Sequence, residues 1–193
     1  MSAKTEQKEK THASILESAE KLVRSKGIAG ARVADVMKGA GLTVGGFYAH
    51  FTSKESLVDE IIRRTAAHTR DRLFAGLEEK EEKDRARLVL ERYLSGTHRD
   101  ECAEGCPFPA IVGEVATGAP EHREVLSEQI SAFASELGSL LPSAESPERR
   151  HLALGLFALM YGGLALARAL RGTALSDEVL RSCRSIGRKV VSR

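Results

Sequence analysis

The sequence contains no tryptophan and few aromatic residues of any kind, since Phe and Tyr make up only 5% of its 193 residues. It contains only three cysteines. Three cysteines are too few for the disulfide framework of a small secreted protein. The scarcity of aromatic residues, together with frequent Ala, Leu, Glu and Arg, favours helices over a β-sandwich or β-barrel. No segment shows the sustained alternation of apolar and polar residues that marks a strand. We therefore expect an all-α protein, long enough to bury a core.

Long apolar runs are also scarce. The first fourteen residues are polar, so we expect no signal peptide. One uncharged run, residues 152–167, is 16 residues long and contains three glycines. Spanning a bilayer takes roughly 17–25 residues. Because there is no second such run and arginines flank this one, we expect a helix buried inside protein. These features predict a cytoplasmic protein without a membrane segment.

Apolar residues recur at the three- and four-residue spacing of helices along the chain. Glycines and prolines interrupt this pattern and divide it into about nine helices. The expected helices lie at residues 11–26, 33–40, 44–50, 54–77, 84–98, 107–117, 121–141, 148–171 and 176–191. We expect the first three to form an N-terminal domain, residues 1–53, and the others a C-terminal helical domain, residues 54–193.

Charge is divided unevenly between these parts. The chain carries 29 Lys and Arg against 27 Asp and Glu, a net charge of +2. Residues 1–50 hold eight of the basic residues and five of the acidic ones, which leaves +3, and the remainder carries −1. Positive charge attracts the phosphates of nucleic acid. The modest surplus on the first fifty residues is therefore in the direction that DNA binding requires.

Residues 33–51 read VADVMKGAGLTVGGFYAHF, which is two short helical segments joined by a glycine-containing turn. This pattern is typical of a helix-turn-helix. In such a motif the first helix braces the second, and the apolar residues placed to do so here are Val33, Val36 and Leu42. The sequence therefore predicts a DNA-binding motif whose second helix is the recognition helix.

Glycine and threonine occupy the turn and the start of this second helix. Gly41 permits the backbone angle of the turn. Thr43 can cap the helix, which leaves its positive end facing outward, where phosphate is attracted. Gly45 and Gly46 have no side chains, so we expect the helix start to approach DNA closely, at the cost of helix propensity.

The spacing of these residues resembles the DNA-binding domain of the TetR/AcrR family of bacterial transcriptional regulators. The family pattern is an Asp–hydrophobic pair, then Ala-Gly-Val/Leu-Ser/Thr, then Gly-x-x-Tyr-x-His-Phe-x-x-Lys-Glu-x-Leu. This sequence matches it at Asp35-Val36, at Ala40-Gly41-Leu42-Thr43 and over Gly45 to Leu57. The resemblance implies a sequence-specific repressor, released from its operator by a small-molecule effector or by thiol modification.

The resemblance implies two groups of DNA contacts. The positions that contact phosphate in the family are Thr43, Tyr48, His50 and Lys54. The positions at the start of the recognition helix, where bases are read, are Val44, Gly45, Gly46 and Phe47. Val44 and Phe47 could touch thymine methyl groups. Part of the Tyr48 and His50 rings could instead pack on the core, and Phe51 is expected to face inward.

Ala31 and Arg32 depart from the family pattern, which commonly has two hydroxyl residues there. The hydroxyl contact to phosphate is lost at Ala31. Arg32 either replaces that contact or reaches a base edge, and the sequence leaves both open. The base preference of relatives therefore does not transfer to this chain.

The last two predicted helices, 148–171 and 176–191, resemble the pair that forms the dimer interface in the family. An independent reason is that the first of them is apolar on nearly all sides and must be buried on several. Gly155, Gly162 and Gly163 would let a partner helix approach closely. A homodimer places two recognition helices about 34–36 Å apart, which predicts a near-palindromic operator. The alternative is that this helix is the core of a monomer.

Two cysteines between the fifth and sixth predicted helices allow three interpretations. His98, Cys102 and Cys106 are spaced by four residues, which on one unbroken helix separates the outer two by about 12 Å, too far for one metal ion. We expect no metal and no cofactor. If Pro107 begins a helix, Cys106 caps it, and the helix dipole lowers the pKa of a thiol there. Cys106 would then be a redox or electrophile sensor, with Cys102 as its resolving partner.

The third interpretation is that Cys106 is a small buried structural residue. Glu101 and Glu104 favour it, because nearby negative charge raises the pKa of a thiol. The Gly-Cys-Pro sequence here, however, resembles a stretch that opens the sixth helix in one branch of the family. Some members of that branch respond to electrophiles or oxidants, so the alternatives stay open.

The family also implies a pocket for a small effector in the C-terminal helices. The apolar and aromatic residues that could line it are Tyr93, Phe108, Phe133, Phe157, Met160 and Tyr161. At helical spacing such residues can equally be core, and their chemistry suggests an apolar or weakly polar ligand. No nucleophile–base spacing or phosphate loop is present, so we do not expect an enzyme. A DNA-binding protein that needs no effector is the other alternative.

Overall fold

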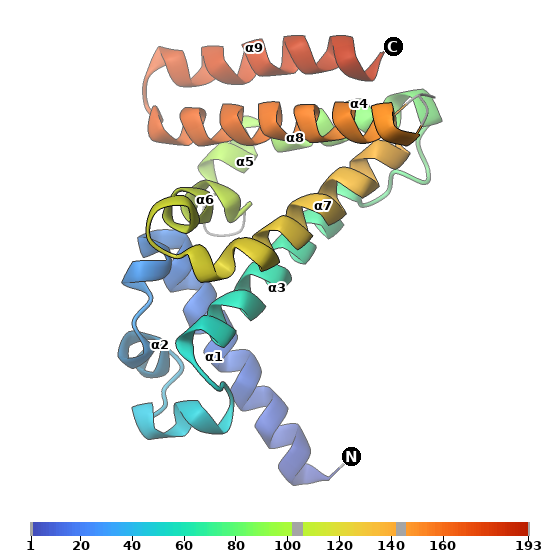
Figure 1. Ribbon diagram of the computed structural model, residues 1–193. Coiled ribbons are helices and arrows are strands. Elements are labelled where there is room, and N and C mark those ends of the chain that lie inside the picture. The colour runs from blue at the N-terminus through green and yellow to red at the C-terminus, as the bar shows by residue number, and fades with distance from the viewer. Residues whose placement is uncertain (1, 102–105, 142–145, 193) are drawn as a thin grey trace. The chain divides into compact units, whose positions relative to one another are not determined.

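Figure 1 shows the protein as a computed structural model, which describes residues 2–101, 106–141 and 146–192. This part of the chain contains nine α-helices, two short 3₁₀ helices and no strand, so the all-α prediction is confirmed. The elements are α1 (Ala3–Gly30), α2 (Val33–Gly39), η1 (Val44–Ala49), α3 (Lys54–Phe74), α4 (Glu82–Tyr93), α5 (Gly96–Asp100), α6 (Phe108–Thr117), η2 (Pro120–His122), α7 (Arg123–Ser139), α8 (Ser146–Ala169) and α9 (Ala174–Val191).

Two helix boundaries differ clearly from those predicted. α1 begins at Ala3 rather than near residue 11, because the polar residues before it are good helix formers. The helix predicted at 84–98 is divided into α4 and α5. The division occurs at Ser95, whose Oγ accepts the His98 N–H at 3.0 Å and so starts a new helix.

The contacts between Cα atoms divide the chain into two compact units. The N-terminal unit comprises the residues up to Thr65 together with Ala110–Leu126. The C-terminal unit comprises Ala66–Pro109 together with the residues from Ser127 onward. Most of α6 therefore belongs to the N-terminal unit, although it lies far from the other helices of that unit in sequence. The functional division expected at residue 53 stays a prediction.

The core of the N-terminal unit is built from one face of α1 and the helices packed on it. Ile15, Ala19 and Val23 are buried at the four-residue spacing of a helix. α1 packs against α2, and α2 packs against η1. Val36 and Met37 of α2 are buried in this core. Burying each large aliphatic side chain contributes about 1.5–3 kcal/mol to folding, so these contacts fix the position of the helix-turn-helix.

Two glycines in this unit have the left-handed backbone that other residues avoid. Gly41 has a φ of 72°, as the turn of the motif requires, which confirms its predicted role. Gly27 also has a φ of 72°, and it kinks α1 three residues before the helix ends at Gly30. The kink turns the Ile28 and Ala29 amides away from the ladder of α1 and leaves them to other acceptors.

The predicted recognition helix is a six-residue 3₁₀ helix, Val44–Ala49, rather than an α-helix. Two successive glycines lower the helix propensity of so short a segment, and 3₁₀ geometry is common in short pieces. Thr43 does occupy the N-cap position, with an extended φ of −85° and ψ of 148°. Its side chain makes no capping hydrogen bond, contrary to expectation.

In the C-terminal unit, α8 and α9 lie side by side, and α4 packs against both (Figure 1). Leu156, Met160 and Leu164 of α8 are buried. A Cβ at Gly163 would lie 2.8 Å from the Sγ of Cys183 on α9, so this glycine allows the two helices of one chain to approach closely. A Cβ at Gly155 or Gly162 would meet no atom within 4 Å.

One helix in the described residues, Pro147–Ala169, is long and apolar enough to cross a membrane by length and composition alone. Within a single chain, 39% of its apolar stretch is buried. The rest of the stretch is half-exposed or exposed within one chain.

Candidate DNA-binding site

The exposed residues of the helix-turn-helix lie in α2, in the turn and on η1. Arg32 is exposed at the N-cap of α2. Thr43 and Gly45 are also exposed, and nothing lies within 4 Å of a Cβ built on Gly45. Tyr48 is 73% exposed and Val44 49%. These five positions are among those of the motif that solvent, and therefore DNA, can reach.

Two expectations about this motif are wrong. Phe47 is completely buried and stacks on Phe51, with ring centroids 5.5 Å apart, so it supports η1 from the core and is inaccessible to a base. Leu42 was expected to brace the two helices, but its side chain is 37% exposed. For Phe47, the tight 3₁₀ winding of η1 sets which side chain faces inward, and a pattern based on α-helical spacing misplaces it. Leu42 lies in the turn before η1.

The amides released by the Gly27 kink are held by a carboxylate from α6. The Ile28 and Ala29 N–H groups donate to the two oxygens of Glu114, at 2.8 and 2.9 Å. The same turn is held from its other side, because the Lys54 Nζ donates to the Ile28 carbonyl at 3.0 Å. We call these contacts the Glu114 clamp. It fixes the chain that enters α2, and it gives Lys54 a structural role besides its predicted phosphate contact.

His50 lies beside His12 on the core side of the motif. The two ring centroids are 6.0 Å apart, and the His12 ring stacks on Phe51 at 4.5 Å. His12 in turn contacts Glu60 through its Nε2, at 2.8 Å. Burial, and then the nearby His12 and Lys8, lower the pKa of His50. His50 is therefore neutral near pH 7, and a contact to phosphate would use a ring N–H rather than a charge.

A second long-range contact in this unit joins α3 to the segment after α6. The Nδ1–H of His122, which is buried, donates to the Asp59 carboxylate at 2.7 Å. Sequence reasoning missed both Glu114 and His122. Their partners lie 86 and 63 residues away in the sequence, and no local spacing signals such pairs.

Residues 15–61 match a protein family described as "Bacterial regulatory proteins, tetR family". The whole fold is similar to a solved TetR transcriptional regulator from Chloroflexus aurantiacus, with a TM-score of 0.78, 24% identity and 97% coverage of each chain. Residues 15–61 are a TetR-family DNA-binding region. The fold is also similar to the reduced form of Escherichia coli NemR, with a TM-score of 0.78, 22% identity, and coverage of 94% of this chain and 97% of that one.

A curated relative is similar to this chain over a short segment. The chain is 36% identical over 59 residues to YvdT of Bacillus subtilis (strain 168), an uncharacterised helix-turn-helix transcriptional regulator. This match covers 31% of the chain and 30% of YvdT. The chain therefore aligns with less than a third of the length of that relative.

The residues expected to line an effector pocket pack mainly against one another. Tyr93, Phe133 and Phe157 are buried, with the Phe133 ring 6.1 Å from Tyr93 and 4.9 Å from Phe157. Phe108 is buried against Phe157, with ring centroids 5.7 Å apart. Met160 is buried as well, and Tyr161 is half-buried. This packing is that of a core, and the assignment of these residues to an effector pocket stays a prediction.

Cys106 is part of a buried, hydrogen-bonded cluster. The Tyr93 hydroxyl donates to its Sγ at 3.2 Å, and its own N–H donates to the His98 Nε2 at 2.9 Å. Arg168 donates to the Cys106 carbonyl and to the His98 carbonyl, each at 2.9 Å. α6 begins at Phe108, so Cys106 is not the cap of that helix as predicted. Cys102, the expected resolving partner, lies outside the described residues.

His98 holds this cluster together as a neutral ring. Because Nε2 accepts the Cys106 N–H, the proton is on Nδ1, which donates to the Tyr93 carbonyl at 2.7 Å. Burial lowers the pKa of His98 from 6.5 to about 4, opposed by the Tyr93 hydrogen bond and aided by Arg168 and Arg72. No group of three or more metal-binding side chains occurs in the described part of the chain.

This lowered pKa predicts a pH dependence of stability. The unfolded chain binds a proton at His98 near pH 6.5, whereas the folded chain binds it only near pH 4. The stabilisation is therefore complete above pH 6.5 and is lost as the pH falls toward 4, by about 2 kcal/mol at pH 5. Urea unfolding at pH 7, 6 and 5 measures the loss. If the free energy of unfolding falls equally with pH in the wild type and in His98→Gln, the pH dependence does not come from His98.

Proposed function

We propose that the protein is a dimeric, cytoplasmic repressor that binds a near-palindromic DNA operator. The observation that carries the proposal is the exposed surface made by Arg32, Thr43, Val44, Gly45 and Tyr48 within the segment that matches the TetR family. It combines a cation, two hydroxyl groups and a side-chain-free backbone, which suit phosphate contact and close approach to base edges. Gly46, His50 and Lys54, partly covered, are the remaining proposed contacts.

The exposed apolar faces of α8 and α9 support dimerisation. On α8 one stripe of exposed or half-exposed small and apolar residues consists of Gly155, Ala158, Gly162, Leu166 and Ala169, spaced by three, four, four and three. On α9 they are Leu175, Val179, Ile186 and Val190, again on one face. An exposed apolar stripe of this kind is typical of a surface that packs against another protein surface. A two-fold axis would pair these faces as a four-helix bundle, which is the dimer expected from the sequence.

Release from the operator is proposed to follow a two-state linkage. An effector, or modification of Cys106, would favour a dimer whose recognition helices no longer match the operator spacing. The buried bonds from Tyr93 and to His98 support a conformational effect of any group added to Cys106, because the group would displace the Tyr93 hydroxyl. A DNA-binding protein that needs no effector is the second candidate.

The DNA-binding proposal predicts how substitutions change operator affinity. The operator is first selected from genomic fragments with the full-length protein, and gel shifts are then run across a salt series. Arg32→Gln should lower the slope of log affinity against log salt by about 0.9, since one phosphate contact is lost. Tyr48→Phe should weaken binding about fivefold at every salt concentration, because it removes only a hydroxyl.

The matched control is Lys21→Gln, which removes an exposed cation that is already paired with Glu17 at 2.8 Å on α1. It should leave the slope unchanged. Equal slopes for Arg32→Gln and the wild type would remove Arg32 from the interface, and failure to select any genomic fragment would end the proposal. The same assay with a quinone added separates the two release routes, since release that survives in Cys106→Ala does not use the thiol.

A further inference from the structure

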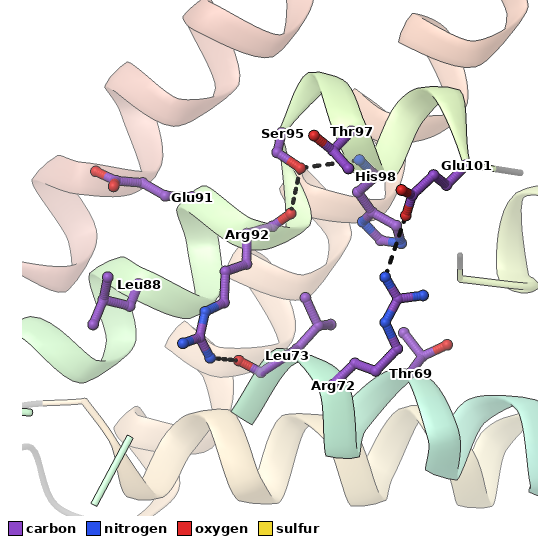
Figure 2. A pocket seen from close by; sticks show the side chains of 10 residues that line it. All are labelled: Thr69, Arg72, Leu73, Leu88, Glu91, Arg92, Ser95, Thr97, His98 and Glu101. Atoms are coloured by element: carbon purple, nitrogen blue, oxygen red, sulfur yellow. Dashed lines mark hydrogen bonds and ion pairs between the residues drawn. The ribbon is translucent and has the colours of Figure 1, made fainter. Parts of the chain in front are cut away.

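A groove of about 440 Å³ lies in the C-terminal unit between the end of α3 and the helices α4 and α5 (Figure 2). Its volume is in the range of small-molecule sites. Leu73 and Leu88 supply its apolar surface, Arg72 and Arg92 its cations, and His98 and Glu101 stand at the α5 end. The six side chains of the expected effector pocket are not among its lining residues.

The charges around the groove do not cancel. Glu91 is paired with Arg188 of α9 at 3.0 Å, so its charge is already compensated. Arg92 donates through one nitrogen to the Leu73 and Ala75 carbonyls, at 2.7 and 2.8 Å, and it forms no ion pair with any described residue. Arg72 and Glu101 neutralise each other. The groove therefore keeps the positive charge of Arg92, which favours an anionic ligand.

The contact between Arg72 and Glu101 is weak enough to exchange. The Arg72 Nη2 and the Glu101 Oε2 are 3.3 Å apart, and the two side chains are 43% and 47% exposed. Exposed ion pairs of this kind contribute about 0–1 kcal/mol. A ligand carboxylate that accepted two parallel N–H bonds from the same guanidinium would bind it better. Figure 2 shows the Arg72 guanidinium directed at Glu101 at the mouth formed with α5.

His98 is neutral and adds no charge to the groove. Both of its ring nitrogens are engaged, one with the Tyr93 carbonyl and the other with the Cys106 amide. It therefore presents ring carbons rather than a hydrogen-bonding group to the groove. Apolar surface next to two guanidinium groups fits a molecule with a carboxylate at one end and a hydrocarbon body.

We propose that this groove binds a small organic carboxylate, with its carboxylate on Arg72 in place of Glu101 and its apolar body against Leu73 and Leu88. The role of such a ligand as the effector rests on the proposed repressor function, whereas its binding does not. Glu101 follows α5 directly, so its displacement would shift the end of the helix that carries His98. Because the Cys106 N–H donates to the His98 ring, this shift would also move Cys106.

Isothermal titration of the full-length protein tests the proposal, with octanoate as the probe and 1-octanol and octylamine as matched controls. Octanoate should bind at least tenfold more tightly than either control. Arg72→Gln should weaken octanoate binding at least tenfold, and Glu101→Gln should tighten it several-fold, because the internal competitor is gone. Arg171→Gln, an exposed arginine outside the groove, should leave the affinity unchanged.

Octanoate that fails to bind below about 10 mM, or that binds Arg72→Gln as well as the wild type, would overturn the proposal, as would equal binding of octanol. Arginine-dependent binding that leaves operator affinity unchanged would confirm the site and contradict the effector role. If the protein bound no operator but still bound octanoate through Arg72, only the repressor proposal would fail. The two proposals can therefore fail separately.

Discussion

The double substitution Leu166→Glu and Ile186→Glu should convert the protein to a monomer and abolish operator binding. Both side chains are more than half exposed in one chain, at 57% and 54%, so their replacement should change the folding of the protomer little. A two-fold axis brings each substitution into the interface twice, which would place four carboxylates in an apolar contact. Light scattering should show a mass falling from about twice 20.9 kDa to 20.9 kDa.

Operator affinity should fall at least a hundredfold in this variant, because a monomer contacts one half-site. Ser185→Glu is the matched control, since Ser185 is also exposed on α9 but is rotated from Ile186 by about 100°. It should remain dimeric. A double variant that keeps the mass of the dimer would show that other surfaces join the two chains.

Replacing Gly27 by alanine should destabilise the protein by about 2–5 kcal/mol. Part of this loss is the backbone strain of a φ of 72°, about 1–2 kcal/mol. The rest comes from the Glu114 clamp, because a Cβ at Gly27 would lie 1.9 Å from the Glu114 Oε1 and force the carboxylate away from the Ile28 and Ala29 amides. The bond from the buried Ile28 amide to this charged group contributes about 1.5–3 kcal/mol, and the bond from the exposed Ala29 amide adds little. Urea unfolding measures the difference.

Gly41→Ala provides the control for the strain alone. Gly41 has the same φ of 72°, but nothing lies within 4 Å of its Cβ position. It should therefore lose only strain energy. Gly27 has in addition a ψ of −178°, a conformation that side chains disfavour further, so the excess loss in Gly27→Ala is assigned to the clamp only as far as Glu114→Gln reproduces it. Glu114→Gln should lose a similar excess without any backbone strain, because an amide offers one oxygen where two N–H groups need acceptors. Equal losses at the two glycines would show that the clamp contributes nothing.

The parts of the fold that depend on neighbouring residues could be predicted from the sequence. The turn at Gly41, the buried pair Val36 and Met37, and the all-helical architecture follow from local spacing and propensity. The orientation of Phe47 could not be predicted in this way, because it depends on whether six residues wind as a 3₁₀ or an α-helix. That choice depends on packing against the core as well as on the two glycines.

The remaining features depend on contacts that have no local signal. Glu114 meets Ile28 across 86 residues, and its sequence neighbours give no reason to choose it over other glutamates. The groove of Figure 2 exists because Ser95 ends α4 and starts α5, whereas the periodicity of residues 84–98 reads as one helix.

The fold does not require glycine at position 45. Its backbone lacks the positive φ that would require glycine, and the space where a side chain would stand is empty of protein atoms. A side chain could be added there without a clash in the folded chain. Under the proposed DNA-binding mode, a change of a single codon at this position alters the DNA sequence that is recognised while the stability of the fold is kept.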